Sequence, residues 1–144
     1  MTTVTAYLYN ARCLGFRIQD ITTRECPSPF YRPTTAADDP KALLGAAASL
    51  SIPAHLQPTL PQVLFPHHPC FDLLPFHVLR ARAITLAAVT PQLFNLFDLK
   101  KDIIEDGLIY DRKDNGSKKP WDMRSWEAAP WFLNKWRLLI DGDC

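Results

Sequence analysis

The sequence predicts an all-α or nearly all-α fold: a compact single-domain bundle of about five to six short helices over residues 1–144. Apolar residues recur at helical spacing along most of the chain, whereas segments with the alternation of a strand are few. With 13 prolines and only 5 glycines, the helices are expected to be short and joined by stiff, proline-rich loops. A chain of this length that is 47% hydrophobic can bury a real core.

The first half of the chain is predicted to alternate short helices with proline-rich segments. Apolar residues in Val4–Ile18 follow helical spacing, and Gly15 is the expected C′ residue where this helix ends. Asp39 and Pro40 have the types expected at the N-cap and N1 positions of a second helix, which is rich in small residues. Residues 51–69 hold five prolines and predict turns or single helical turns.

A central buried helix is predicted over Leu73–Val89, because this segment is apolar on nearly every side. Asp72 is its expected N-cap, and Pro75 is tolerated because it falls in the first turn. Arg80 and Arg82 are two residues apart and cannot share a face. Either one of them is held against a carboxylate inside the fold, or both extend their charged ends to solvent.

The next helix is predicted to begin at Thr90-Pro91, an N-cap residue followed by proline at N1, and to end at Gly107. Its expected apolar stripe consists of Leu93, Leu96, Phe97, Ile103 and Ile104.

The last quarter of the chain carries weaker signals of regular structure. Leu108–Tyr110 is short and β-prone, and Asp111–Pro120 reads as a polar loop. Asp122 can cap a short turn, and Pro130 can start the final helix, which is expected to continue to Ile140.

All four tryptophans lie in this quarter, at Trp121, Trp126, Trp131 and Trp136. Five-residue steps on an α-helix rotate the side chain by about 140° each, so the rings cannot form one stripe. Pro130 also predicts a break between the second and third rings. We expect Trp121, Trp126 and Trp136 in the core or in a pocket wall, and Trp131 at the surface.

The first candidate site is the polar group His67, His68 and Asp72. An imidazole that titrates near neutral pH and a carboxylate that orients it are the parts of a proton-transfer site. The alternative is structural: Asp72 caps a helix while a histidine bonds to loop carbonyl groups. Adjacent side chains of an extended segment point apart and no second ligand cluster follows, so no metal site and no cofactor are expected.

The second candidate site is a group of polar residues and indole rings suited to a planar ligand or a partner peptide. Its members are Trp121, Asp122, Arg124, Trp126, Glu127 and Trp131. In the structural alternative, Asp122 caps a turn, Arg124 and Glu127 form an i,i+3 salt bridge, and the indoles fill the core.

The composition bounds the classes of partner and compartment. The net charge is +1 and the basic pairs are scattered among acids, so we expect no direct DNA binding by this chain. The four cysteines, at positions 13, 26, 70 and 144, form neither a disulfide framework nor a zinc motif. Reduced thiols and the lack of a secretory signal at the N-terminus predict an intracellular protein of the cytoplasm or nucleus, not a secreted one. Prolines interrupt the longest uncharged segment, so no membrane helix is expected.

Three blocks of the sequence carry a resemblance: SPFY at Ser28–Tyr31, HHPCFDLLPF at His67–Phe76, and PWDMRSWEAAPWFLNKW at Pro120–Trp136. Together they resemble the fungal domain of unknown function that often lies C-terminal to a bZIP region in fungal transcription factors, over about residues 7–142. Two departures stand out. No basic region or leucine zipper precedes Tyr7, and Cys70 stands where the resemblance implies an aromatic residue.

The resemblance implies a non-enzymatic regulatory or interaction module of a fungal transcription or pathway-control protein. Such a module would bind a protein partner or a small metabolite, with homo-oligomer formation left open, or would act as an inhibitor that competes with longer relatives. The alternative is a small cofactor-free enzyme of fungal secondary metabolism, of the isomerase or cyclase type. It would use His67 or His68 with Asp72 for proton transfer in a Trp-lined pocket.

Overall fold

The computed structural model describes residues 2–24, 26–110 and 119–140, and helices dominate these residues, as the sequence predicts. The α-helices are α1 (Thr3–Cys13), α2 (Ile18–Thr22), α3 (Pro40–Ala47), α4 (Leu60–Leu64), α5 (His77–Val89), α6 (Leu96–Asp102), α7 (Pro130–Lys135) and α8 (Arg137–Ile140). Short 3-10 turns occur at η1 (Ala54–Leu56), η2 (Pro69–Leu73) and η4 (Met123–Ser125), and a π-turn, η3 (Ile103–Gly107), continues α6. The fold is not purely helical, because β1 (Leu108–Tyr110) pairs with β2 (Trp126–Ala128).

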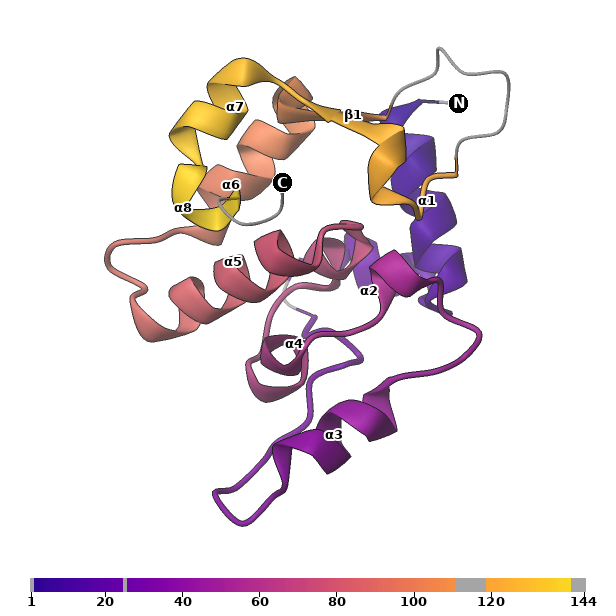
Figure 1. The fold of residues 1–144 in the computed structure, drawn as a ribbon, viewed down its shortest axis with the longest axis vertical. Coiled ribbons are helices and arrows are strands. Elements are labelled where there is room, and N and C mark those ends of the chain that lie inside the picture. The colour runs from indigo at the N-terminus through magenta and orange to yellow at the C-terminus, as the bar shows by residue number, and fades with distance from the viewer. Residues whose placement is uncertain (1, 25, 111–118, 141–144) are drawn as a thin grey trace.

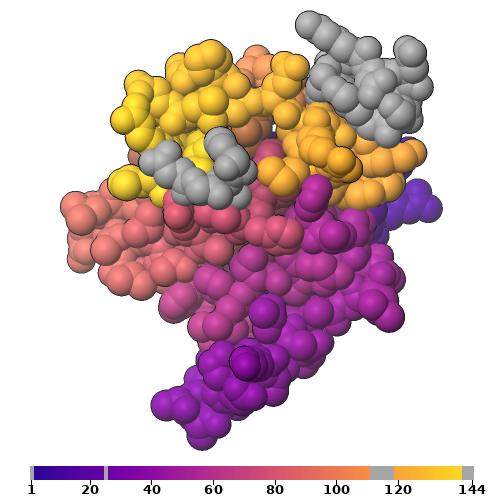
Figure 2. Space-filling view, viewed as in Figure 1, coloured from indigo at the N-terminus to yellow at the C-terminus, as the bar shows by residue number. Residues whose placement is uncertain are grey.

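Helix α5 crosses the middle of the molecule, with α6, α7 and α8 on one side of it and α4 on the other (Figure 1). Helix α3 projects at the end opposite to the C-terminal helices, and the space-filling view shows this projection clearly (Figure 2). The strands β1 and β2 are antiparallel, with Tyr110 opposite Trp126 and Leu108 opposite Ala128. This small sheet connects the α6 side of the molecule to α7.

The core lies between α1, η2, α5, α6 and the C-terminal segment. Its buried members are Ala6, Phe71, Leu74, Leu79, Ala83, Leu99, Ile103, Leu108, Tyr110, Trp126, Phe132 and Leu139. At Gly107 a Cβ atom would collide with the Phe132 ring and with the carbonyl of Asp102, so only glycine lets α7 pack this closely. The polar side chain of Asn10 is fully buried, and its Nδ2 donates to the carbonyls of Leu73 (3.0 Å) and Pro120 (2.9 Å).

Several predicted helix boundaries are confirmed. Asp39 caps α3 by accepting from the backbone N–H of Lys41, with Pro40 at N1. Gly15 follows α1 with a φ of +74°, as a C′ residue does. Asp122 caps η4, and Pro130 opens α7.

Two predicted N-caps are wrong. Asp72 lies inside η2, and α5 begins later, at His77. Its N-cap residue is Phe76, whose side chain makes no capping hydrogen bond. Thr90 ends α5 instead of starting the next helix, because its hydroxyl donates to the carbonyl of Leu86. Helix α6 starts at Leu96, where the Asn95 side chain accepts from the N–H of Phe97.

The predicted apolar stripe of α6 is also wrong in part. Leu93 is 88% exposed, Phe97 65% and Ile104 64%, whereas Leu96 and Ile103 pack against or within the core as predicted, together with Leu99. Leu96, Leu99 and Ile103 share one face by their i, i+3, i+7 spacing, whereas Leu93 precedes the helix and Phe97 and Ile104 lie off this face. Arg80, in α5, is buried within the fold and donates to the carbonyl of Gln57 at 2.9 Å.

The tryptophans point in different directions, as helix geometry predicts. Trp126 is buried, Trp136 packs against the core, and Trp131 is 45% exposed on α7. Trp121 is half-buried. The predicted final helix breaks at Trp136 into α7 and α8, which contributes to a larger number of helices than the sequence predicts. Within the described residues, no helix has the length and apolar character needed to cross a bilayer.

Candidate functional site

The Asp72 network is a closed group of four polar side chains: Ser28, Gln62, His67 and Asp72. Oδ1 of Asp72 accepts from Nε2 of Gln62 at 2.7 Å and from Nε2 of His67 at 2.7 Å, and the Ser28 hydroxyl donates to its other oxygen. The side chains of His67 and Asp72 have no exposed surface. The carboxylate therefore joins three separate segments of the chain inside the protein and has no opening to a substrate.

Both ring nitrogens of His67 are occupied. Nδ1 lies 2.8 Å from the carbonyl oxygen of Phe65, and Nε2 faces the carboxylate. Both partners only accept, so the geometry assigns a proton to each nitrogen and a positive charge to the ring. Burial acts to lower the pKa of His67, but the hydrogen bond and charge of Asp72, helped by the Phe65 carbonyl, outweigh it and raise the pKa.

His68 turns the other way and is half-buried. Its Nδ1 accepts from the N–H of Cys70 at 3.1 Å, which caps η2, and its Nε2 donates to the carbonyl of Thr23 at 2.9 Å. Burial lowers the pKa of His68, and the nearby charge of Lys100 adds to this effect despite the Thr23 carbonyl. The ring is therefore neutral near pH 7, and its two nitrogens hold backbone groups of η2 and of the segment after α2.

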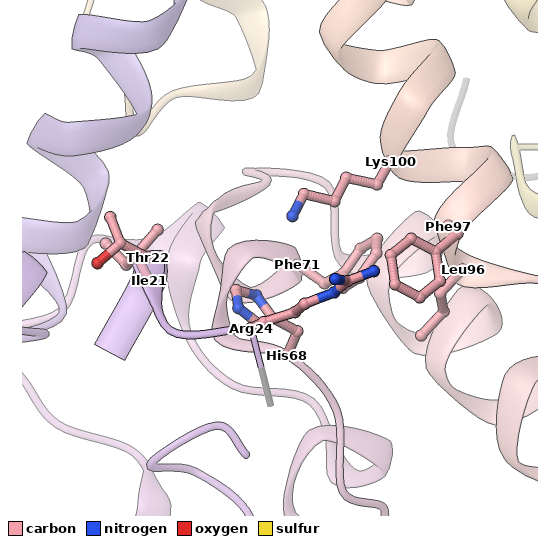
Figure 3. Close-up of a pocket in the computed structure, with 8 residues that line it drawn as sticks. All are labelled: Ile21, Thr22, Arg24, His68, Phe71, Leu96, Phe97 and Lys100. Carbon is pink, nitrogen blue, oxygen red and sulfur yellow. The ribbon is translucent and has the colours of Figure 1, made fainter. Parts of the chain in front are cut away.

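A cavity of about 420 Å³ lies beside His68, between α2, η2 and α6. We call it the α2–α6 cavity, and Figure 3 shows the side chains that line it. They are Ile21, Thr22, Arg24, His68, Phe71, Leu96, Phe97 and Lys100. Its volume falls in the range of small-molecule sites.

A second, smaller hollow of about 200 Å³ continues from this cavity toward α1, and we call it the apolar trough. The two hollows share Ile21, Phe71 and Lys100. The other residues of the trough are Val4, Tyr7, Cys70, Leu73, Leu74, Ile103 and Ile104. Burial raises the pKa of the Cys70 thiol to about 12, more than the charge of Lys100 lowers it, so this cysteine stays protonated.

Two basic side chains, Arg24 and Lys100, give the α2–α6 cavity a positive charge, and no described lining residue neutralises it. None of the eight described lining residues is acidic, and Figure 3 shows Arg24 and Lys100 among the side chains that surround the cavity. No ion pair joins Arg24 or Lys100 to a carboxylate among the described residues. Elsewhere, by contrast, Lys135 pairs with Asp102 at 2.7 Å.

The second predicted site forms a structural turn. Nη2 of Arg124 pairs with Asp122 at 2.7 Å, and this pair holds the pKa of Asp122 down, at about 2. The predicted pair of Arg124 with Glu127 is wrong, because Glu127 lies on β2, opposite Ile109. Nε1 of Trp126 donates to the carbonyl of Pro120 at 2.8 Å.

The described structure brings Trp121, Asp122 and Arg124 together at η4, while Trp131 lies apart on α7. No tryptophan lines the α2–α6 cavity or the apolar trough. Apart from His68, the walls of these hollows come from residues that the sequence did not single out as a site, above all Arg24, Phe97 and Lys100. The one available signal was the excess of apolar residues on α6, more than a single inward face can hold.

No group of three or more histidine, cysteine or acidic side chains in the described residues has an arrangement that could hold a metal ion.

A family model described as "Domain of unknown function (DUF3425)" matches residues 44–144. No curated protein and no solved structure matches the chain. The matched region begins within α3 and includes His67, Asp72, α6 and the tryptophans, whereas α1, α2 and Arg24 precede it.

Proposed function

We propose that this chain, which belongs to the DUF3425 family of domains of unknown function, is a non-enzymatic regulatory module that binds a small metabolite in the α2–α6 cavity. The resemblance to the fungal domain that follows bZIP regions supports a role in transcriptional or pathway control. A location in the cytoplasm or nucleus belongs to the same proposal. The alternative ligand, which the same resemblance implies, is a protein partner.

The observation that carries the proposal is the separation of His67 and Asp72 from the cavity. His67 and Asp72 are sealed in a network that uses both ring nitrogens. The cavity beside them is concave, largely apolar and positively charged, which are properties of a binding site. None of the described residues that line it carries a carboxylate that could act as a base or orient one.

The enzyme alternative has less support from this geometry. An isomerase or cyclase of the predicted type needs an imidazole nitrogen that is free to take or give a proton. The His68 ring does line the cavity, but its nitrogens bond to Thr23 and Cys70. Catalysis would require the ring to give up one of these backbone contacts.

A binding screen with a cavity-filling variant tests the proposal. Thermal unfolding is measured with neutral, cationic and anionic compounds that have apolar bodies, and mass spectrometry follows each compound over time. Ile21→Trp fills the junction of the two hollows. Ile18→Trp is the matched control, because Ile18 lies on the same helix, is 66% exposed and lines neither hollow.

We expect at least one compound to raise the melting temperature of the wild type and of Ile18→Trp but not of Ile21→Trp, and to be recovered unchanged. A ligand present at 100 times its Kd stabilises the protein by about 2.7 kcal/mol. Conversion of a compound that His68→Ala abolishes would favour the enzyme. Stabilisation by no compound, together with a co-purified protein, would favour a protein partner.

A further inference from the structure

The imbalance of charge in the α2–α6 cavity selects the type of ligand. Arg24 and Lys100 face the same space, and among the described residues that line it none is acidic. A cation held against phenylalanine rings loses part of its hydration, and an anion brought to it restores that loss. A carboxylate can accept hydrogen bonds from the ammonium and the guanidinium at once and also offsets their charge, which a neutral or cationic ligand does not do.

The apolar trough selects the body of the ligand. Apart from Lys100, which borders both hollows, its walls are mostly aliphatic and aromatic side chains from α1, η2 and η3. A hydrocarbon chain or ring that enters the trough from the cavity would cover apolar surface around Phe71, Ile103 and Ile104. Such burial contributes about 25 cal/mol for each Å² removed from water.

Tyr7 lines the trough and carries a buried polar atom that has no partner among the described residues. The hydroxyl of Tyr7 is buried and makes no hydrogen bond to any of the described residues. Burial, and next to it the sulfur of Cys70, raise the pKa of this phenol, so it remains a donor at physiological pH. A buried donor without an acceptor destabilises the protein, and a ligand oxygen in the trough would supply the acceptor.

We infer that the ligand of this cavity is a small carboxylate with an apolar body that carries a second oxygen, such as a keto or hydroxy acid. The carboxylate lies between Lys100 and Arg24, the body passes Phe71 into the trough, and the second oxygen accepts from the Tyr7 hydroxyl. This assignment rests on the proposed binding function and specifies the chemistry of its ligand.

Calorimetric titration with three matched probes tests the choice of head group. Octanoate, octan-1-ol and octylammonium share one chain length and differ in charge. We expect octanoate to bind the wild type at least tenfold more tightly than either of the others. Lys100→Met should weaken octanoate binding roughly 10- to 100-fold, the effect of losing a charge-assisted hydrogen bond, and leave octan-1-ol unchanged.

Lys101→Met is the matched control, because Lys101 is the next residue of α6, is exposed and lines neither hollow. It should bind octanoate as the wild type does. The second oxygen is tested with 7-oxooctanoate: Tyr7→Phe should remove its advantage over octanoate, which we expect to be up to about tenfold. Thermal unfolding of each variant without probe verifies that it is folded.

Several results would overturn the assignment. Equal binding of the three octyl probes, or the same octanoate affinity in Lys100→Met as in the wild type, would exclude a carboxylate site while leaving a binding module intact. An acidic amphipathic peptide that binds where octanoate does not, and that depends on Lys100, would move the site to a protein partner. If no apolar compound of any charge binds, the proposed function fails as well.

Discussion

The adjacent residues His67 and His68 face two regions that differ in how their charges are balanced. In the Asp72 network every oxygen of the carboxylate has a donor, and the whole group is closed to solvent. In the α2–α6 cavity two cations share a space whose described lining residues include no acidic side chain. A buried charged group whose hydrogen-bond partners all come from the protein stabilises the fold. A charged group that lines a cavity without such partners can instead bind a ligand. Residue type alone does not separate these two roles.

The largest expected effect breaks the closed region. Asp72→Ala removes the acceptor of Ser28, Gln62 and His67 together and leaves a buried imidazole without its counter-charge. We expect a loss of about 3–5 kcal/mol in the free energy of unfolding, measured by urea denaturation. Glu127→Ala, at an exposed strand position, should change stability by no more than about 0.5 kcal/mol. A similar loss of unfolding free energy in the two variants would show that Asp72 does not hold the three segments together.

The pH dependence of stability follows from the raised pKa of His67. The folded state holds its proton to higher pH than the unfolded chain, so the stabilisation is fully present below the unfolded value of about 6.5. It is lost as the pH rises from there through the raised pKa, by up to about 1.4 kcal/mol per pH unit. Denaturation midpoints at a series of pH values should show this fall in the wild type and in His68→Gln, but not in His67→Gln.

Tyr7→Phe, in the apolar trough, should stabilise the ligand-free protein. The substitution removes a buried hydroxyl that has no partner among the described residues, so the ligand-free protein is expected to gain about 1 kcal/mol of stability. Differential scanning calorimetry measures this gain. A clear loss of stability would mean that the hydroxyl already has a partner and is not kept for a ligand.

Phe97→Ala should have the smallest effect on stability, within about 0.5 kcal/mol, because the ring is 65% exposed and lies outside the core. It removes one wall of the cavity, so binding of apolar probes should weaken several-fold. The comparison with Leu93→Ala, exposed at 88% and outside the cavity, separates loss of the wall from a general loss of surface apolarity. Equal probe binding in both variants would exclude Phe97 from the site.

The sequence predicted the features that depend on neighbours in the chain. Asp39 with Pro40, Asp122 and Pro130 act within one turn of helix, so their roles could be read locally. Asp72 has the same local signature, but donors from Ser28, 44 residues away, and from Gln62 draw its carboxylate into the interior.

The candidate site shows the same limit. His67 and Asp72 were expected to meet, and they do, because five residues separate them. Arg24 and Lys100 come from opposite halves of the chain, and only the tertiary fold, in which α2 packs against η2, places them around one cavity. No local sequence pattern connects the two cations. The dipeptide Lys100–Lys101 also does not indicate that Lys100 lines a cavity while Lys101 is exposed to solvent.

The buried amide of Asn10 has a consequence for how much of the chain makes a self-sufficient unit. This one side chain, from α1, ties the carbonyl of Leu73 to that of Pro120, and Ser28 completes the bonding of Asp72. All of these donors precede residue 44, where the match to the DUF3425 family model starts. A fragment cut at that point would keep the family's sequence signature but lose the groups that hold its central turn and its C-terminal segment together. The segment that the family model detects is therefore shorter than the segment that supplies these stabilising hydrogen bonds.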